Sequence, residues 1–309
     1  MALQSQDGRD PALWPFSSES PWNLPLGRGA RYAPPDDPCT RDLIDPSIPA
    51  WINAAEWSMP VYVANEADRP VPIVRDGVQV TSLRIPQGAR PSGPEGQDSD
   101  AHLLVVTPDR RFVDELWRAR PRPNGGWDVA SWSRNDLYGM GIGRGGERAY
   151  GGSALGGLIR RHELASGIPH ALALAIPRHR QRRGFVWPAS GEDDGAADSY
   201  RGHVPMGQLV AIPPEVNLAA LPLSSAGRRI GEALQRYGAY DVDSAASFTL
   251  FAEPQLEGEL ADARSDLLLL RPWMRCVSNN SENNPGGGGE PLAPRAPPLL
   301  PWTRFARQQ

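Results

Sequence analysis

Short apolar runs, rich in β-branched and aromatic residues, alternate with turn residues along most of the chain. Glycine and proline, 32 and 33 of the 309 residues, are spread through its whole length, and both interrupt long helices. Apolar runs bounded by turn residues are typical of β-strands. The sequence predicts strands at residues 60–64, 71–74, 101–106, 112–117, 126–132, 170–176, 185–187, 208–212 and 247–252.

One amphipathic helix is predicted from about Ser225 to Tyr237. Ser224 precedes it as an N-cap, and Gly238 follows it as a C-terminal stop. We expect its apolar stripe to pack against a sheet. The residues of that stripe are Ala226, Ile230, Ala233, Leu234 and Tyr237.

The spacing of the strands is more typical of a β-sandwich than of a βαβ array. We therefore expect a mainly β fold: a single antiparallel β-sandwich or jelly-roll-like domain with one or two short helices, over residues 12–277. Residues 1–11 are expected to be loose. Residues 278–309 are polar and rich in Gly and Pro, which predicts a disordered tail.

Charge and residue usage argue against several classes of protein. The net charge is −4 and all 32 basic residues are arginine, so we expect neither a nucleic-acid partner nor lysine chemistry. No apolar run is long enough to predict a membrane span. No signal peptide is visible at the start of the chain, so the protein is either cytoplasmic or a mature or truncated form.

The two cysteines, Cys39 and Cys276, do not have the spacing of a zinc site. They form one disulfide if the protein is exported, because oxidising compartments allow such bridges. The alternative is two unrelated buried thiols.

Three motifs that would name an activity are incomplete. Residues 141–146 match GxGxxG, but the expected strand and helix do not flank them, so we interpret them as a surface loop. His162 and Glu163 begin an HExxH motif, but Ser166 stands where the second histidine belongs. Ser153 lies in GGSALG and not in a GxSxG elbow, so no serine triad is anchored there.

His102, Glu115 and His170 are the candidate catalytic residues. A four-residue hairpin loop after Val106 would place His102 directly across from Glu115. His170 begins the next apolar strand and joins them if that strand is a neighbour of the hairpin. The three could then divide acid and base roles or hold a divalent metal. The structural interpretation, in which each histidine is only hydrogen-bonded, carries more weight, so we predict no cofactor and keep a divalent metal as the alternative.

Aromatic and polar side chains on predicted loops and strand ends form a candidate sugar-binding surface. Indole rings stack on pyranose faces, and planar polar groups pair with sugar hydroxyls. The other interpretation is that the tryptophans form the core of a sandwich. The predicted substrate-binding residues are Asp100, Trp132, Arg134, Asn135, Asp136, Tyr138 and Trp187.

Several blocks of the sequence resemble a recurrent group of bacterial, often exported proteins that are mainly uncharacterised. The blocks are SPWNLP, DAHLLVV, IPHALALAIP, FVWPA and LQRYGAYDVDS, and the similarity covers about residues 14–253. In this group, one histidine and the glutamate match His102 and Glu115, and a second histidine matches His170. The resemblance implies a shared β-rich domain and an extracellular or periplasmic location. It transfers no established activity.

We therefore expect a carbohydrate-active protein whose partner is a polysaccharide or oligosaccharide. The first hypothesis is a glycan-cleaving enzyme, a lyase or a glycoside hydrolase, in which His102 and His170 are acid/base groups and Glu115 orients them. The second is a non-catalytic glycan-binding or cell-envelope-associated module. The third is a metal-dependent, cupin-like enzyme.

Overall fold

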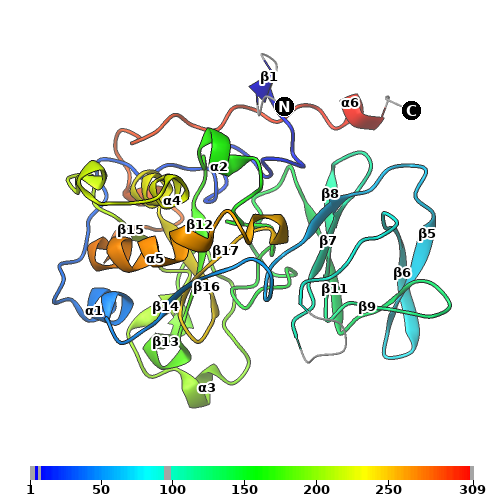
Figure 1. The fold of residues 1–309 in the computed structure, drawn as a ribbon, viewed down its shortest axis with the longest axis horizontal. Helices are drawn as coiled ribbons and strands as arrows, with labels where there is room; N and C mark the ends of the chain where they lie inside the picture. The colour runs from blue at the N-terminus through cyan, green and yellow to red at the C-terminus, as the bar shows by residue number, and fades with distance from the viewer. Residues whose placement is uncertain (1–3, 6–7, 94–98, 307–309) are drawn as a thin grey trace.

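The computed structural model describes residues 4–5, 8–93 and 99–306. The chain forms a larger body and a smaller lobe, which lie side by side in Figure 1. The body surrounds one six-stranded sheet, and the lobe contains two four-stranded sheets. Helices cover the body, whereas the described part of the lobe consists of strands and loops.

The six-stranded sheet combines parallel and antiparallel neighbours. β12 is parallel to β16, and β17 is parallel to β3, but β12 and β17 are antiparallel. In their order across the sheet, the strands are β18 (Arg275–Cys276), β15 (Leu209–Ala211), β16 (Ala239–Ser244), β12 (Leu172–Ile176), β17 (Phe248–Phe251) and β3 (Ala50–Asn53).

Six α-helices and five 3₁₀ turns occur among the described residues. The α-helices are α1 (Pro38–Ile44), α2 (Glu163–Ser166), α3 (Ala196–Ser199), α4 (Ser225–Arg236), α5 (Ala261–Leu270) and α6 (Thr303–Ala306). The 3₁₀ turns are η1 (Arg178–Arg180), η2 (Leu218–Ala220), η3 (Pro254–Leu256), η4 (Arg271–Trp273) and η5 (Pro285–Gly287). Two small two-stranded sheets pair β1 (Gln4–Ser5) with β2 (Gly8–Arg9) and β13 (Gln181–Phe185) with β14 (Val204–Met206).

Alternation along β12 divides the core of the body into two layers. Leu172, Leu174 and Ile176 belong to one apolar cluster with Ile230 of α4 and Leu267 of α5. The alanines between them belong to the opposite cluster, which contains large aromatic rings. Because long side chains meet helices and short ones meet rings, both layers fill closely.

Helix α4 confirms the predicted helix, including both of its ends. The Ser224 hydroxyl accepts a hydrogen bond from the Gly227 N–H at 3.0 Å. Gly238 donates to the Ala233 carbonyl and has a φ of +76°, a conformation that favours glycine. Ser224 also donates to Asp266 Oδ2 at 2.5 Å, which ties the start of α4 to α5.

The two sheets of the lobe share a core of their own. Ile73 and Leu83 from one sheet are clustered with Leu103, Val105 and Leu116 from the other. The first sheet has the order β6 (Val78–Arg84), β5 (Pro70–Arg75), β10 (Trp127–Asp128) and β9 (Arg120–Pro121). The second has the order β11 (Ser131–Asp136), β8 (Phe112–Trp117), β7 (Leu103–Val106) and β4 (Val61–Val63).

The second face of β7 and β8 lies against the body. Leu104, Val106 and Val113 belong to the same apolar cluster as Trp22 and Tyr150. The lobe is therefore attached through buried contacts, and polar side chains on this face of β7 and β8 lie where body and lobe meet.

The β-rich class predicted from the sequence is confirmed, but the strand pairing and helix count differ from the prediction. The sheets are mixed and not purely antiparallel, and six α-helices stand in the described ranges where one or two were expected. The reason lies in strands such as β12, which are buried on both faces and for that reason suit parallel neighbours.

The C-terminal segment, expected to be a disordered tail, is described as far as residue 306, and residues 292–300 bind the N-terminal segment. The Leu292 N–H donates to the Leu26 carbonyl at 2.8 Å, the Arg9 N–H donates to the Pro298 carbonyl at 3.0 Å, and the Leu300 N–H donates to the Arg9 carbonyl at 2.9 Å. The fully buried Arg9 side chain donates to the carbonyls of Trp14, Pro15, Phe16 and Pro297. The polar backbone of this Gly/Pro-rich segment is thus satisfied by the other end of the chain.

Cys39 of α1 and Cys276 of β18 form a disulfide, with their Cα atoms 6.2 Å apart. Of the two alternatives that the sequence left open, the bridge is the one observed. It joins positions 237 residues apart and fixes α1 against the edge of the six-stranded sheet.

Candidate functional site

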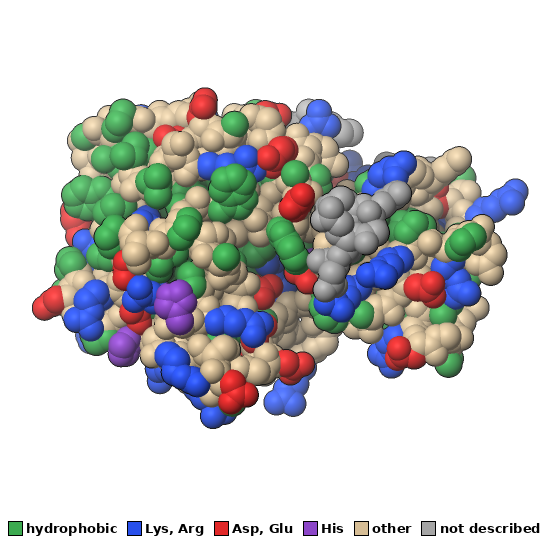
Figure 2. Space-filling model, turned by 60° about the horizontal axis from the view of Figure 1, so that its bottom comes forward, with side chains coloured by type: hydrophobic (Ala, Val, Ile, Leu, Met, Phe, Trp, Pro, Cys, Tyr) green, Lys and Arg blue, Asp and Glu red, His purple; other side chains and the backbone are tan. Residues whose placement is uncertain are grey.

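A cavity of about 660 Å³ opens where the body meets the lobe, a volume within the usual range of small-molecule sites. We call it the junction cavity. Figure 2 shows this face, with acidic side chains beside apolar ones between the two parts of the molecule. Its described lining consists of Trp51, residues 53–57, Met59, Asp100, residues 243–247, Thr249, Phe251, Glu257 and Arg264.

Two of the four carboxyl groups in the described lining of the junction cavity, Asp243 and Asp100, come from different parts of the fold. Asp243 lies near the end of β16 in the body, and 28% of its side chain is exposed. Asp100 lies just before β7 in the lobe. The Trp117 indole donates a hydrogen bond to Asp100 Oδ1 at 3.1 Å, so strand β8 fixes the position of this carboxylate.

A buried arginine lies behind Asp243. The Arg148 side chain is fully buried, and its Nη1 is 3.8 Å from Asp243 Oδ2. Its guanidinium carbon lies 3.9 Å from the centre of the Phe251 ring. None of its three nitrogens has a hydrogen-bond partner among the described residues. Arg148 therefore acts on Asp243 by charge and not through a hydrogen bond.

The surroundings of Asp243 bring its titration near neutrality. Burial raises the pKa of Asp243 to about 7, with a further upward contribution from Asp193 and Asp100, and Arg148 opposes this rise. A carboxyl group with such a pKa can hold a proton and release it near neutral pH, which is the property required of a general acid.

Glu115, one of the predicted catalytic residues, is fully buried behind the cavity. Its carboxylate accepts hydrogen bonds from the Ser153 hydroxyl and from the backbone N–H groups of Ala154 (2.9 Å) and Glu147 (3.3 Å). Burial raises the pKa of Glu115 to about 7. Glu115 thus holds the loop that carries Arg148 and does not line the junction cavity.

His102 shares this face of the lobe but is also buried, with 4% exposure. Burial, and then the charge of Arg148, lower the pKa of His102 to about 3. Its imidazole is therefore neutral at physiological pH, and its Nδ1 has no hydrogen-bond partner among the described residues.

The register that was predicted between His102 and Glu115 is wrong by two residues. Val106 pairs with Val113, so Leu104 lies across from Glu115. The turn spans residues 107–112 and is longer than expected, because Thr107 and Phe112 are hydrogen-bonded across it. The Thr107 N–H donates to the Phe112 carbonyl, and the Thr107 hydroxyl accepts a hydrogen bond from the Phe112 N–H. The same hydroxyl donates to Asp109 within the turn. A shift of two residues keeps both side chains on the same face.

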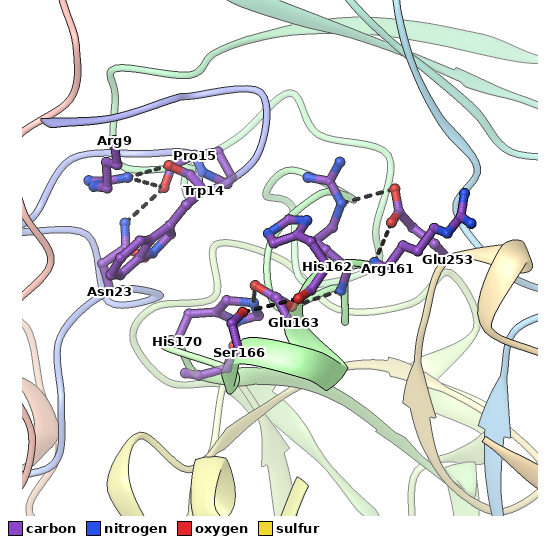
Figure 3. A network of polar contacts seen from close by, with 12 residues as sticks. Arg9, Trp14, Pro15, Asn23, Arg161, His162, Glu163, Ser166, His170 and Glu253 are labelled. Carbon is purple, nitrogen blue, oxygen red and sulfur yellow. Dashed lines mark hydrogen bonds and ion pairs between the residues drawn. The ribbon is translucent and has the colours of Figure 1, made fainter. Parts of the chain in front are cut away.

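His170, the third predicted catalytic residue, belongs to a separate buried network (Figure 3). Its Nε2 lies 2.9 Å from Glu163 Oε1, and its Nδ1 lies 2.8 Å from the Ala171 carbonyl. Glu163 Oε2 in turn accepts the Arg160 N–H at 2.7 Å. Burial lowers the pKa of His170, but the charge and hydrogen bond of Glu163 outweigh burial and raise it. The adjoining cavity is only about 10 Å³, so no ligand has room beside this pair.

Among the predicted substrate-binding residues, Asp100 lines the junction cavity and the others do not. Trp132 and Arg134 both bind Asp114 in the lobe, each bond being 2.9 Å long. The Tyr138 hydroxyl donates to the Leu300 carbonyl at 2.6 Å.

The remaining three predicted residues also have other environments. Asp136 accepts a bond from the Tyr138 N–H at 2.8 Å, and Asn135 is half-buried on β11. Trp187 packs edge-on against Tyr240. The predicted aromatic residues therefore do not form one surface. Trp132 lies in the lobe, Tyr138 binds the C-terminal segment, and Trp187 packs within the body.

The two tryptophans in the described lining of the cavity, Trp51 and Trp57, were not predicted as binding residues. They are 46% and 43% exposed. Arg264 lies over the Trp51 ring, 4.2 Å from its centre, and forms an ion pair with Glu257 at 2.6 Å. Trp51 lies on β3 and Trp57 follows six residues later, and no local pattern marks these two tryptophans as exposed.

Asp243 and Arg148 were also missed. Asp241 and Asp243 alternate with apolar residues in the block LQRYGAYDVDS, a pattern that could have identified a strand with carboxylates on one face. Nothing in the sequence around Arg148 distinguishes it from the other arginines, because the groups around it, such as Phe251 and Glu115, come from distant segments.

No set of three or more His, Cys, Asp and Glu side chains in the described ranges is arranged to hold a metal ion. His102, Glu115 and His170 therefore do not form the metal set that the third hypothesis requires. Within the same ranges, no helix has the length and apolar character needed to cross a membrane.

In comparisons with known protein families, curated proteins and solved structures, nothing matches this chain. The candidate site therefore rests on the geometry of the junction cavity alone.

Proposed function

We propose that this protein is a glycan-cleaving enzyme of the glycoside hydrolase type that binds its saccharide in the junction cavity. The observation that carries the proposal is a pair of carboxyl groups, Asp100 and Asp243, in a cavity walled by the exposed indoles of Trp51 and Trp57. Glycosidases generally use two carboxyl groups that flank the scissile bond. Indole faces supply the apolar stacking that sugar rings require.

Asp243 is the proton donor in this proposal. Its protonated carboxyl group gives its proton to the glycosidic oxygen, the bond to the anomeric carbon breaks, and the leaving sugar departs with a free hydroxyl group. Asp100 is the second carboxyl group. It either takes a proton from the water that attacks the anomeric carbon or attacks that carbon itself, after which water releases the sugar.

The charges of the cavity favour hydrolysis over lyase chemistry. A lyase removes a proton next to the carboxylate of a uronic acid, so its site must attract an anionic sugar. The described lining of the junction cavity carries four acidic side chains and one arginine, and this excess of acid repels anions. An exported location agrees with the disulfide between Cys39 and Cys276.

A non-catalytic glycan-binding module is the second candidate function. The observation that favours it is the exposure of Trp51 and Trp57, because exposed indoles bind saccharides without any acid or base. The two functions differ in one measurable property, the formation of a new reducing end.

A glycan panel tests the proposal directly. We expect the purified protein to release new reducing ends from at least one β-linked glycan without forming an unsaturated sugar. The Asp243→Asn variant keeps the oxygen that accepts the Ser244 N–H at 2.9 Å but cannot donate the acidic proton. We expect it to lose about 10³-fold in kcat.

Asp194→Asn is the matched control, since Asp194 is exposed and lies outside the cavity lining. It should cleave like the wild type. Cleavage that survives Asp243→Asn would remove Asp243 from its role. Unsaturated products would show a lyase, and binding without new reducing ends would show a binding module.

A further inference from the structure

The charges of the junction cavity bear on which glycans it accepts. Arg264 is the one basic side chain in the described lining, and it is paired with Glu257 at 2.6 Å. Glu56, Asp100 and Asp243 are the other acidic side chains there. Arg148 compensates part of the charge of Asp243 from behind, but it is fully buried and does not line the cavity.

Arg264 shows how this cavity holds a cation. Its guanidinium lies over the Trp51 ring, 4.2 Å from the centre, and also meets the Glu257 carboxylate. An aromatic face combined with a carboxylate is an effective receptor for organic cations. Trp57 and Glu56, which are adjacent in the chain and both exposed, offer the same two groups in the same cavity.

We infer that the junction cavity accepts a glycan with free, protonated amino groups, which Trp57 and the carboxylates of Glu56 and Asp100 recognise. This inference rests on the proposed function and names its substrate class. An ammonium group on a sugar ring gains from the carboxylates and from the indole face together. A neutral sugar gains only the stacking, and a uronic acid is repelled.

Two hexasaccharides with the same β-1,4-linked glucose skeleton test the inference. One is the glucosamine hexamer, and the other is cellohexaose, which carries a hydroxyl group where the first carries an amine. Binding to the wild-type protein is measured by calorimetry at about pH 5.5, where the amine holds its proton. Reducing ends are measured in the same samples.

We expect the glucosamine hexamer to bind about tenfold more tightly than cellohexaose at low salt. The preference should fall to about threefold or less when salt rises from about 50 mM to about 500 mM, because salt screens exposed charges. Glu56→Gln should reduce the preference by about threefold. Glu259→Gln, an exposed residue outside the cavity lining, is the matched control and should keep the full preference.

The outcomes separate this inference from the proposed function. Equal or tighter binding of cellohexaose, together with its cleavage, overturns the substrate class and leaves the hydrolase in place. Preferred binding of the glucosamine hexamer without new reducing ends supports the ligand class and overturns the catalytic role. If neither hexamer binds and no glycan of the panel is cleaved, both are overturned.

Discussion

Two acidic side chains, Asp243 at the junction cavity and Glu163 beside His170, each face a basic group, but their surroundings differ. Glu163 is fully buried, and its two oxygens are bonded to His170 and to the Arg160 N–H. The Asp243 side chain is 28% exposed. The basic group that it faces is Arg148, whose Nη1 lies 3.8 Å from Asp243 Oδ2 and forms no hydrogen bond with it. The cavity beside Glu163 is about 10 Å³, and that beside Asp243 is about 660 Å³.

The difference shows why residue type alone does not identify a functional site. A His–Glu pair looks catalytic in a sequence, yet a carboxylate whose hydrogen bonds are complete has nothing left to offer a substrate and stabilises the fold. A carboxyl group that is partly desolvated and incompletely paired keeps a shifted pKa and remains accessible. Asp243 meets this second description.

The largest effect that separates the two regions is expected from Glu163→Ala. Loss of this carboxylate leaves Nε2 of the buried His170 without its partner, and we expect the free energy of unfolding to fall by about 3 kcal/mol. Urea denaturation followed by circular dichroism measures this change. Under conditions where the variant is folded, kcat should equal that of the wild type.

A surface pair provides the control for Glu163→Ala. Glu19 and Arg295 form an ion pair in which both side chains are more than half exposed, so Glu19→Ala should change stability by less than about 0.5 kcal/mol.

The pH dependence of stability adds a second check on the pair of Glu163 and His170. The pKa of His170 is raised in the folded protein. Its pairing with Glu163 therefore stabilises the fold fully at a pH below the pKa that His170 has in the unfolded chain. This stabilisation is lost as the pH rises through the pKa that His170 has in the folded protein. A Glu163→Ala variant that is as stable as the wild type would contradict the structural role.

Several strands and the best-marked helix were predictable because their signals are local, whereas β3, β6 and β16 were not predicted. The strand predicted at 112–117 coincides with β8, and α4 ends within a residue of its prediction. The alternation along β12 was also read correctly, with leucines in one layer and alanines in the other. These patterns depend on the faces of single elements.

The candidate site was only partly predictable because it depends on contacts between distant segments. Asp100 was identified, but its partner Asp243 comes from another part of the chain and from the body. The groups around Arg148 come from distant segments as well. His170 was expected to join His102 only if its strand neighboured the hairpin, but β12 and β7 belong to different sheets, and strand order is not encoded in a local pattern.

Arg148→Met is expected to have the next largest effect, on the pH profile of cleavage. Arg148 holds down the pKa of Asp243, which is about 7 in the wild type. Removing the guanidinium should therefore raise the pKa of Asp243. The alkaline limit, meaning the pH at which kcat falls to half its maximum on the alkaline side, should move up by about one pH unit. Methionine preserves the contact with Phe251.

Asp193→Asn provides the opposite test. Asp193 raises the pKa of Asp243, so its neutralisation should move the alkaline limit down by about half a unit. Arg182→Met, an exposed substitution, should leave the profile unchanged. If both Arg148→Met and Asp193→Asn shift the limit in the same direction, or neither shifts it, Asp243 is not the group that titrates.

The smallest expected effect comes from Trp57→Ala. Stacking of an aromatic ring contributes about 0.5–1.5 kcal/mol beyond buried area, so we expect KM for a cleaved oligosaccharide to rise about three- to tenfold with little change in kcat. Trp273 is 41% exposed, close to the 43% of Trp57, but it does not line the junction cavity. Trp273→Ala should leave KM unchanged. Equal effects of the two substitutions would mean that the exposed indoles affect the stability of the protein and not the binding of the saccharide. Trp57 would then be excluded as a saccharide-binding residue.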